Sequence, residues 1–510
     1  MSDMTKPMAP PMLDAQVRGE QLIRAEAMER TSIFGKMIVP TLIYAVVFAF
    51  CVYDNWYGIL MGGFAIATIV YMKHMMKVFG VEQKRGSLFY MVALVLLGFS
   101  NGLTGDDVII FFNDLFIIGL VVVFLLHNYM DDVKWGPVAY LGAIFQSIFG
   151  AIPCIGDLGK DAACYSRSED NASKKSLFSV LIGIGIAIPL MLIIVGLLCS
   201  ADVVFATILH DTLHIDFYTC FGVLLTFLFG FVAAYCGMRF MGKGNVKFDA
   251  TEGKRFGAVV AVTVLSMITV VYVFFSVIQI LSLFLGKMTL PDGYTYAKYA
   301  REGFFQLLFV CLLNVAIVLF TMAKFEQDLR VKWLLTAISI CTYIMLASSA
   351  MRMMMYIQVY YLTRLRFMVL WGLATIAVVL IGVMIATFRK AFPLFKYLIV
   401  SVGIAYLVLS YSHMDYFITK YNLEAGAARA VDGDMEFTYF DQEYLNGLST
   451  DAAMAFVNST TTLKSAETHY LENKSYYGNE NFESWRQFNL SHALLRYYFG
   501  DEMKALVIQD

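Results

Sequence analysis

The chain lacks several features that mark well-known classes of enzymes and secreted proteins. Charged residues make up only 15% of its 510 residues, and there are only nine prolines. All eight cysteines lie before residue 342 and none has CxxC spacing, so the sequence indicates neither a disulfide framework nor a thiolate metal site. It also contains no glycine-rich phosphate-binding loop and no nucleophile elbow. No catalytic motif and no cofactor are therefore expected.

Hydrophobic residues, by contrast, are abundant and clustered. They make up 59% of the chain, the mean hydropathy is +0.66, and apolar runs recur at the length of about 20 residues that a helix needs to cross a bilayer. We predict an all-α, polytopic transmembrane helix bundle of about eleven spans, preceded by a tail at 1–35 and filling 36–412. The predicted spans are 38–53, 57–72, 88–103, 108–127, 177–200, 217–238, 256–285, 304–322, 333–361, 367–388 and 394–411.

Basic residues alternate between the two ends of these spans. They gather at 73–85, 160–175, 239–255, 324–332 and 389–396, whereas the turns between them are short or acidic. Cytoplasmic loops of membrane proteins carry the excess of Lys and Arg. This pattern predicts a multi-pass membrane protein with the N-terminus inside and the C-terminus outside.

One further apolar segment, 138–155, bears on this count. A crossing there would place the basic clusters at 160–175 and 239–255 outside. We therefore predict a re-entrant or interfacial helix bracketed by Pro137 and Pro153. If the segment crossed instead, the C-terminal tail would lie inside.

The tail at 413–510 has a different composition. It contains no proline and no cysteine, and its seven Lys and Arg face fifteen Asp and Glu. We predict a small, acidic, soluble helical domain with helices at 440–446, 451–471 and 483–499, the middle one capped by Ser449 or Thr450. Its aromatic residues would form the core: Tyr439, Phe440, Tyr444, Phe456, Tyr470, Trp485, Phe488, Tyr497 and Phe499.

A polar stripe runs through the largely apolar segment 348–366. At about 100° per residue, one helix face would carry Arg352, Tyr356, Tyr360, Thr363 and Arg366. Because an arginine facing lipid costs about 2.5 kcal/mol or more, the stripe should face protein or water.

Three stretches in this order resemble the bacterial integral-membrane family catalogued as domain of unknown function 4173, to which a family numbered 4153 is related. They are 299–307, the stripe itself, and 415–422 followed by Asp441, Tyr444, Leu445, Leu448, Ser449, Asp451 and Ala452. The resemblance covers roughly 100–500 and implies a helical protein of a bacterial cytoplasmic (inner) membrane, without catalytic residues to carry over. The family usually has a glycine at this position, where this chain has Tyr361. Because the glycine that would permit a sharp turn is missing, we predict a continuous helix through Tyr361.

The sharpest candidate site combines Arg301, Glu302 and Arg352, which the predicted topology places at the outer face. Arginine binds carboxylate or phosphate through two parallel hydrogen bonds, so these residues could bind an anion or polar ligand. Equally, Glu302 and Arg352 could form an ion pair that pins two helices. The remaining ligand-binding candidates are Gln306, Tyr356, Tyr360, Thr363 and Arg366.

Two further groups are candidates for a site. Asn113 and Asp114 lie inside a predicted span, where a carboxylate marks either an ion or proton path or a hydrogen-bonded tie between helices, for instance to Asn314. His210 and His214 have the i, i+4 spacing of a metal-binding helix face, but a solvated polar loop is the default interpretation.

Together these patterns favour a non-enzymatic membrane protein, a transporter-like or sensory component that binds a polar ligand at its outer face. The alternatives are a membrane enzyme acting on a lipid-linked or envelope substrate and a scaffold for a membrane partner. Membrane lipids are expected partners, together with an unknown protein or small ligand. Basic residues are spread as topology signals, so no nucleic acid is expected.

Overall fold

The computed structural model describes most of the chain. The described residues are 11–55, 57–132, 135, 137–167, 194–202, 217–244, 246, 256–281, 296–389, 391–431, 439–457, 464–479 and 485–507, with a few single residues between 187 and 207. Within them every regular element is a helix, and the one β-bridge, between Phe256 and Phe325, is isolated. The prediction of an all-α protein is confirmed.

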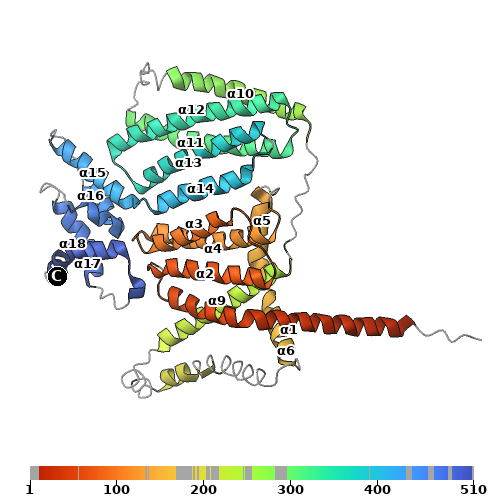
Figure 1. The fold of residues 1–510 in the computed structure, drawn as a ribbon. Helices are drawn as coiled ribbons and strands as arrows, with labels where there is room; N and C mark the ends of the chain where they lie inside the picture. Colours follow the sequence, from red (N-terminus) through yellow and green to blue (C-terminus); the bar gives the residue numbers. More distant parts are fainter. Residues whose placement is uncertain are drawn as a thin grey trace, which may run out of the picture.

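Long helices lie side by side in two groups joined by α14 (Leu394–Ser410), as Figure 1 shows. The first group contains α1 (Pro11–Val52), α2 (Leu60–Val78), α3 (Ser87–Asn101), α4 (Asp107–Tyr129) and α9 (Phe217–Gly242). The second contains α10 (Ala258–Gln279), α11 (Tyr296–Lys324), α12 (Leu329–Tyr360) and α13 (Arg364–Phe388). Each group has its own apolar core, and Tyr406 and Leu409 of α14 pack into a small core with α3 and α4.

Seven helices of the described residues are long and apolar enough to cross a membrane, or nine if two bent pairs each count as one span. The chain is therefore a multi-pass membrane protein. Ten of the eleven predicted spans coincide with α1–α4 and α9–α14, but α3 is only 15 residues long and the span at 177–200 lies largely outside the described residues. The figure of eleven spans stays a prediction.

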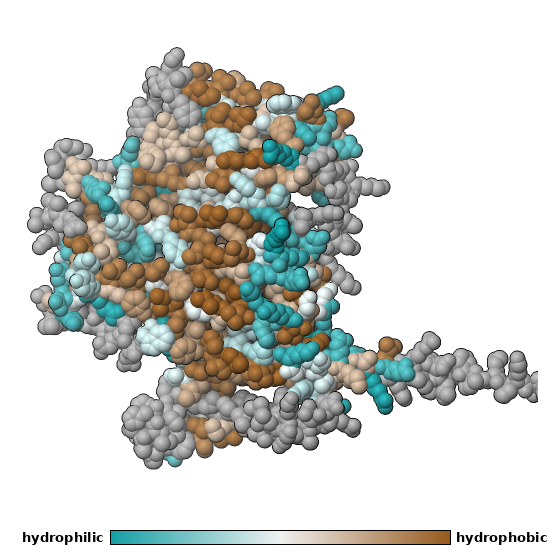
Figure 2. All heavy atoms as spheres, in the orientation of Figure 1, coloured by the Kyte–Doolittle hydropathy of each residue, from teal (hydrophilic) through white to brown (hydrophobic). Residues whose placement is uncertain are grey.

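An apolar band divides the visible face of the molecule into two polar ends, as Figure 2 shows. We call one end the cap end; it carries the turns at 53–59, 102–106, 361–363 and 411–413. The other, the basic end, carries Lys84, Arg239, Lys243, Arg389 and Lys396. This arrangement matches the alternation of charge in the sequence.

Two short helices, α5 (Pro137–Ala151) and α6 (Cys154–Arg167), lie at the basic end and meet at a bend of 47°. Near one end of α5, Tyr140 donates a hydrogen bond to Asp132, 3.0 Å away, and near its other end Gly150 faces Phe240 at the end of α9. Both ends of α5 therefore contact the basic end of the bundle, and the re-entrant or interfacial helix at 138–155 stays a prediction.

The C-terminal segment forms a helical cap over the bundle. It comprises α15 (Met414–Val431), α16 (Tyr439–Asn446), the 3-10 turn η2 (Thr450–Ala455), α17 (Lys464–Asn479), the 3-10 turn η4 (Trp485–Gln487) and α18 (Leu490–Val507). Buried cap residues such as Tyr470, Leu495 and Met503 belong to one continuous apolar core with Phe304 and Met353 of the bundle. The cap therefore shares its core with the second group of helices.

Two predictions for this segment are wrong in detail. The expected single helix at 451–471 is divided: η2 covers Thr450–Ala455 and α17 begins only at Lys464. Ser449 takes the N-cap position of η2, but its side chain makes no capping hydrogen bond. Among the aromatic residues expected in the core, Trp485, Phe488 and Tyr497 are exposed, whereas Phe456, Tyr470 and Phe499 are buried.

The contact between α2 and α3 depends on a glycine. A Cβ atom at Gly98 would lie 2.5 Å from the carbonyl oxygen of Met61, whereas one at Gly119 of α4 would meet nothing within 4 Å. Gly98→Ala should therefore force the helices apart at a cost of about 1–3 kcal/mol. Gly119→Ala should be neutral or slightly stabilising, because alanine favours helix. Thermal melts in detergent would test this: equal melting temperatures for the two variants would contradict it.

Candidate functional site

The polar stripe is interrupted where α12 ends. Tyr361 has φ 64°, a left-handed conformation, so the predicted continuous helix is wrong. The break is stabilised from the cap: Asn422 accepts a hydrogen bond from the Leu362 N–H (2.8 Å) and donates one to the Leu362 carbonyl (2.9 Å). Arg366 donates to the carbonyls of Tyr360 and Tyr361, so the helix end has hydrogen-bond partners although no glycine is present.

This break changes the face that the stripe residues share. Thr363 and Arg366 belong to α13, not α12, with Thr363 at its N-cap position. Two stripe residues on either side of the break nevertheless remain in contact. The Arg366 guanidinium of α13 lies 4.4 Å from the centre of the Tyr356 ring of α12. Tyr360 is largely exposed.

Arg352 lies buried inside the second group of helices. Its guanidinium donates to Gln279 of α10 over 3.4 Å, and Ser348 donates to the same oxygen over 2.6 Å. The side chains of Arg301 and Glu302 lie outside the described residues, so the ion pair with Arg352 stays a prediction. Gln306 is exposed on α11, and His210 and His214 also lie outside the described residues.

The strongest charge cluster forms around Arg364, at the start of α13. Its guanidinium binds the Asp415 carboxylate of the cap in the two-pronged manner, with one N–O distance of 2.8 Å. The same guanidinium lies 3.3 Å from Asp106, in the α3–α4 turn. Asp415, which has no exposed surface, also accepts a hydrogen bond of 2.7 Å from the Ser449 backbone. One cation therefore joins α13, the α3–α4 turn and the cap.

Asp106 has a second role at the N-cap of α4. One carboxylate oxygen accepts hydrogen bonds from the backbones of Val108 (3.0 Å) and Ile109 (3.4 Å). The other is buried, and among the described residues it accepts no hydrogen bond and makes an ion pair with Arg364. Burial, and next the negative charge of Asp415, raise the pKa of Asp106 to about 6.

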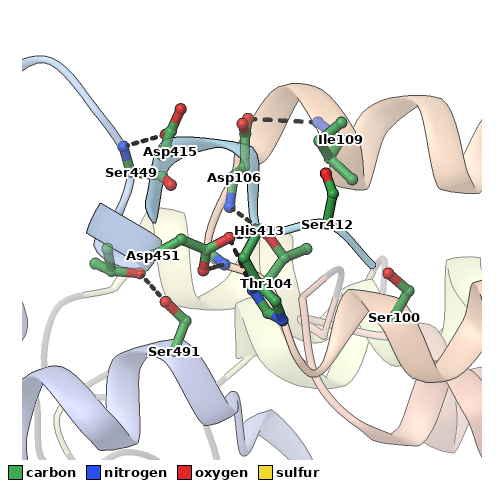
Figure 3. A network of polar contacts seen from close by, with 12 residues as sticks. Ser100, Thr104, Asp106, Ile109, Ser412, His413, Asp415, Ser449, Asp451 and Ser491 are labelled. Atoms are coloured by element: carbon green, nitrogen blue, oxygen red, sulfur yellow. Dashed lines mark hydrogen bonds and ion pairs between the residues drawn. The ribbon is translucent and has the colours of Figure 1, made fainter. Parts of the chain in front are cut away.

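A second carboxylate of the cap, Asp451, binds the α3–α4 turn directly. It accepts hydrogen bonds from the Thr104 hydroxyl and from the Gly105 backbone (2.8 Å), and the His413 imidazole lies 3.3 Å away (Figure 3). Burial favours the neutral acid, but hydrogen bonds from His413, Ser491 and Thr104 outweigh it and hold the pKa of Asp451 below its usual value. The hydrogen bond to Asp451 raises the pKa of His413.

Asn489, at the start of α18, adds further ties to the first group of helices. Its side-chain amide lies within hydrogen-bonding distance of three carbonyls, those of Tyr57 (3.0 Å), Asn101 (3.0 Å) and Thr104 (2.8 Å). Its oxygen accepts from the Ser491 backbone, so the same residue also caps α18. One side chain of the cap therefore binds both the α1–α2 connection and the α3–α4 connection of the first group.

The intramembrane polar pair predicted at Asn113 and Asp114 forms a tie between three helices. Asn101 of α3 donates to Asp114 (2.8 Å) and accepts from Asn113 (2.9 Å). Tyr406 and Ser410 of α14 both donate to Asn113, over 2.9 and 2.8 Å.

Asn314, proposed as a partner of Asn113, has other partners. It accepts a hydrogen bond from Tyr272 (2.7 Å) and donates one to Thr342 (2.9 Å). The suggested contact between Asn113 and Asn314 is therefore wrong, because each amide is satisfied by nearer helices.

Sequence reasoning missed Arg364, Asp106 and His413 as members of one site. Asp415 and Asp451 had a signal, since both stand in the C-terminal motif of the resemblance. Arg364 was overlooked because it falls off the polar stripe when the stripe is projected on one uninterrupted helix. The contact of Asp106 with Arg364 joins positions 258 residues apart, which no local pattern indicates.

Four titrating groups set the pH dependence of this end. Asp106, whose pKa is raised from 3.8 to about 6, contributes stability as the protonated acid below pH 3.8 and loses this contribution as the pH rises to about 6. His413, with its pKa raised from 6.5, contributes stability at lower pH and loses it as the pH rises through its folded value. On the acid side, Asp451 loses its contribution as it is protonated, and burial, which lowers the pKa of His492 to about 4, penalises charging that residue.

Between about pH 4 and pH 6.5 the contributions of Asp106 and His492 oppose each other, so we predict a stability plateau in this range. Stability should fall at lower pH because of Asp451 and at higher pH because of His413. His413→Gln should flatten the alkaline side of the profile, because the group whose protonation stabilises the folded state there is gone. His469→Gln, which changes an exposed histidine of α17, should leave the profile unchanged. Melting temperatures measured from about pH 4 to about pH 9 would test this. A His413→Gln profile identical to the wild type would contradict the assignment.

The comparisons with known proteins place the chain in a family without a stated activity. The model of a family described as "Domain of unknown function (DUF4153)" matches residues 91–459, whereas membership of the family numbered 4173 is not confirmed. No curated protein and no solved structure matches the chain. The matched segment extends from α3 to η2 and includes Asp106, Arg364, Asp415 and Asp451. The chain belongs to the DUF4153 family of membrane-protein domains.

Proposed function

We propose that this protein is a non-enzymatic sensory or transporter-like component of a bacterial cytoplasmic membrane. In this proposal the cap lies on the outer face, where a polar ligand binds and alters the contact between cap and bundle. The observation that carries it is the double attachment of the cap. Asp451 and Asn489 bind turns of the first group of helices, while Asp415 binds Arg364 of the second.

This attachment supports coupling because the two groups touch mainly through α14. A ligand that competes for Arg364 would change the contact of the cap with α13 and with the α3–α4 turn together. Breaking one partner of such a buried pair costs about 3–5 kcal/mol, enough to shift a two-state equilibrium strongly.

A second candidate function, a membrane enzyme for a lipid-linked substrate, is favoured by one observation. The His413 imidazole is partly exposed beside the buried Asp451, and a histidine oriented by a carboxylate can act as a general acid or base. The described residues around it offer no nucleophile held by His413, since its partner is the carboxylate itself. We therefore place the enzyme second.

The proposed orientation gives one prediction. A reporter that fluoresces only in the cytoplasm should be dark when fused after Asp510 and bright when inserted between Lys243 and Lys254, because basic loops stay inside. A bright C-terminal fusion would move the cap to the inner face and remove the proposed outer ligand site.

A second prediction concerns coupling from the cap to the far end of the bundle. Asp451→Asn removes the charge that His413 faces and should increase hydrogen–deuterium exchange at 100–106, and also at 127–132 where α4 reaches the basic end. Asp501→Asn, at an exposed site on α18, is the matched control and should change neither segment. Faster exchange confined to 100–106 would count against a sensory or transport role and favour an enzyme or a scaffold.

A further inference from the structure

The η4 turn is pinned to the end of the first helical hairpin. The Arg486 guanidinium donates to the carbonyl of Tyr53 over 2.6 Å, and the side-chain amide of Gln487 donates to the carbonyl of Asp54 over 2.9 Å. These carbonyls belong to the turn that directly follows α1. The segment is therefore held at the level where an apolar, membrane-spanning helix ends.

Large aromatic side chains nevertheless remain uncovered on this segment. Trp485 is 68% exposed and Phe488 is 42% exposed. The centre of the Trp485 ring lies 6.2 Å from that of Phe50, which is itself 46% exposed in the last turn of α1. The aromatic surface of the cap thus continues the apolar surface that α1 presents to lipid.

The chemistry of these side chains fits the lipid–water boundary. Tryptophan combines a large apolar ring with one N–H donor, and it is enriched where membrane proteins meet the headgroups. Arg486 supplies the charge expected there, with its guanidinium 5.0 Å from the centre of the Phe50 ring. At the basic end, exposed Trp333 packs edge-on against Phe388, so an aromatic residue of this kind marks both ends of the apolar band.

We propose that η4 is a membrane-surface anchor, in which Trp485 and Phe488 lie among the headgroups and upper acyl chains of phospholipids beside the last turn of α1. The partner is the bilayer itself, because the exposed rings are continuous with the lipid-facing surface of a spanning helix. The cap is therefore attached to the bilayer as well as to the bundle. The proposal holds whichever function the protein has and whichever face the cap occupies.

Tryptophan fluorescence of the full-length protein in phosphatidylcholine–phosphatidylglycerol vesicles tests this. Trp485→Phe keeps an aromatic ring, so the emission that it removes reports on Trp485 alone. That emission should be quenched strongly when the lipids are replaced by analogues brominated near the headgroup, and only weakly by aqueous acrylamide. Trp135→Phe is the matched control, because Trp135 is only 7% exposed and its emission should resist both quenchers.

Two outcomes would overturn the proposal. Strong quenching of the Trp485 emission by acrylamide without quenching by brominated lipid would place the ring in water. Resistance to both quenchers would mean that protein covers it, for instance a second copy of the chain. In that case the same protein diluted to one chain per vesicle should regain quenching.

Discussion

A carboxylate buried at the end of a membrane bundle determines much of this structure. Asp415 has no exposed surface, so its charge requires compensating partners in place of water. Arg364 and the Ser449 backbone supply them, and both must then hold fixed positions. The start of α13 and the turn before η2 are therefore specified by a single charged group. Because Arg364 also faces Asp106, the first group of helices is held in the same arrangement.

The two ends of the bundle satisfy their buried charges in similar ways but with different elements. At the basic end, buried Asp161 of α6 accepts bonds from Arg30 (2.8 Å), Arg239 (2.9 Å) and Tyr235 (2.9 Å), which joins α1, α6 and α9. At the cap end the acidic residues come largely from the C-terminal segment and the cation from α13. In both places a buried carboxylate fixes a short element across the ends of longer helices, where lipid gives way to polar groups.

Much of the helical architecture could be predicted from the sequence. Apolar runs located α1–α4 and α9–α14, since the length and composition of a spanning helix are local properties. The break at Tyr361 could not be read in this way. The positive φ angle of Tyr361 is stabilised by the Asn422 side chain, which binds the neighbouring Leu362. Asn422 is 60 residues from Leu362 in the sequence, so no local pattern indicates this contact. The exposed Trp485 and Phe488 were assigned to a core because aromatic content alone does not distinguish a core from a lipid-facing surface.

The order in which a chain is made gives the Asn489 contacts a further consequence. Tyr57, Asn101 and Thr104 are synthesised with the first hairpins, whereas the amide that binds their carbonyls follows 385 to 432 residues later. Until then these turns can be satisfied only by water. The first third of the protein thus reaches its final hydrogen bonding only after nearly the whole chain has been made.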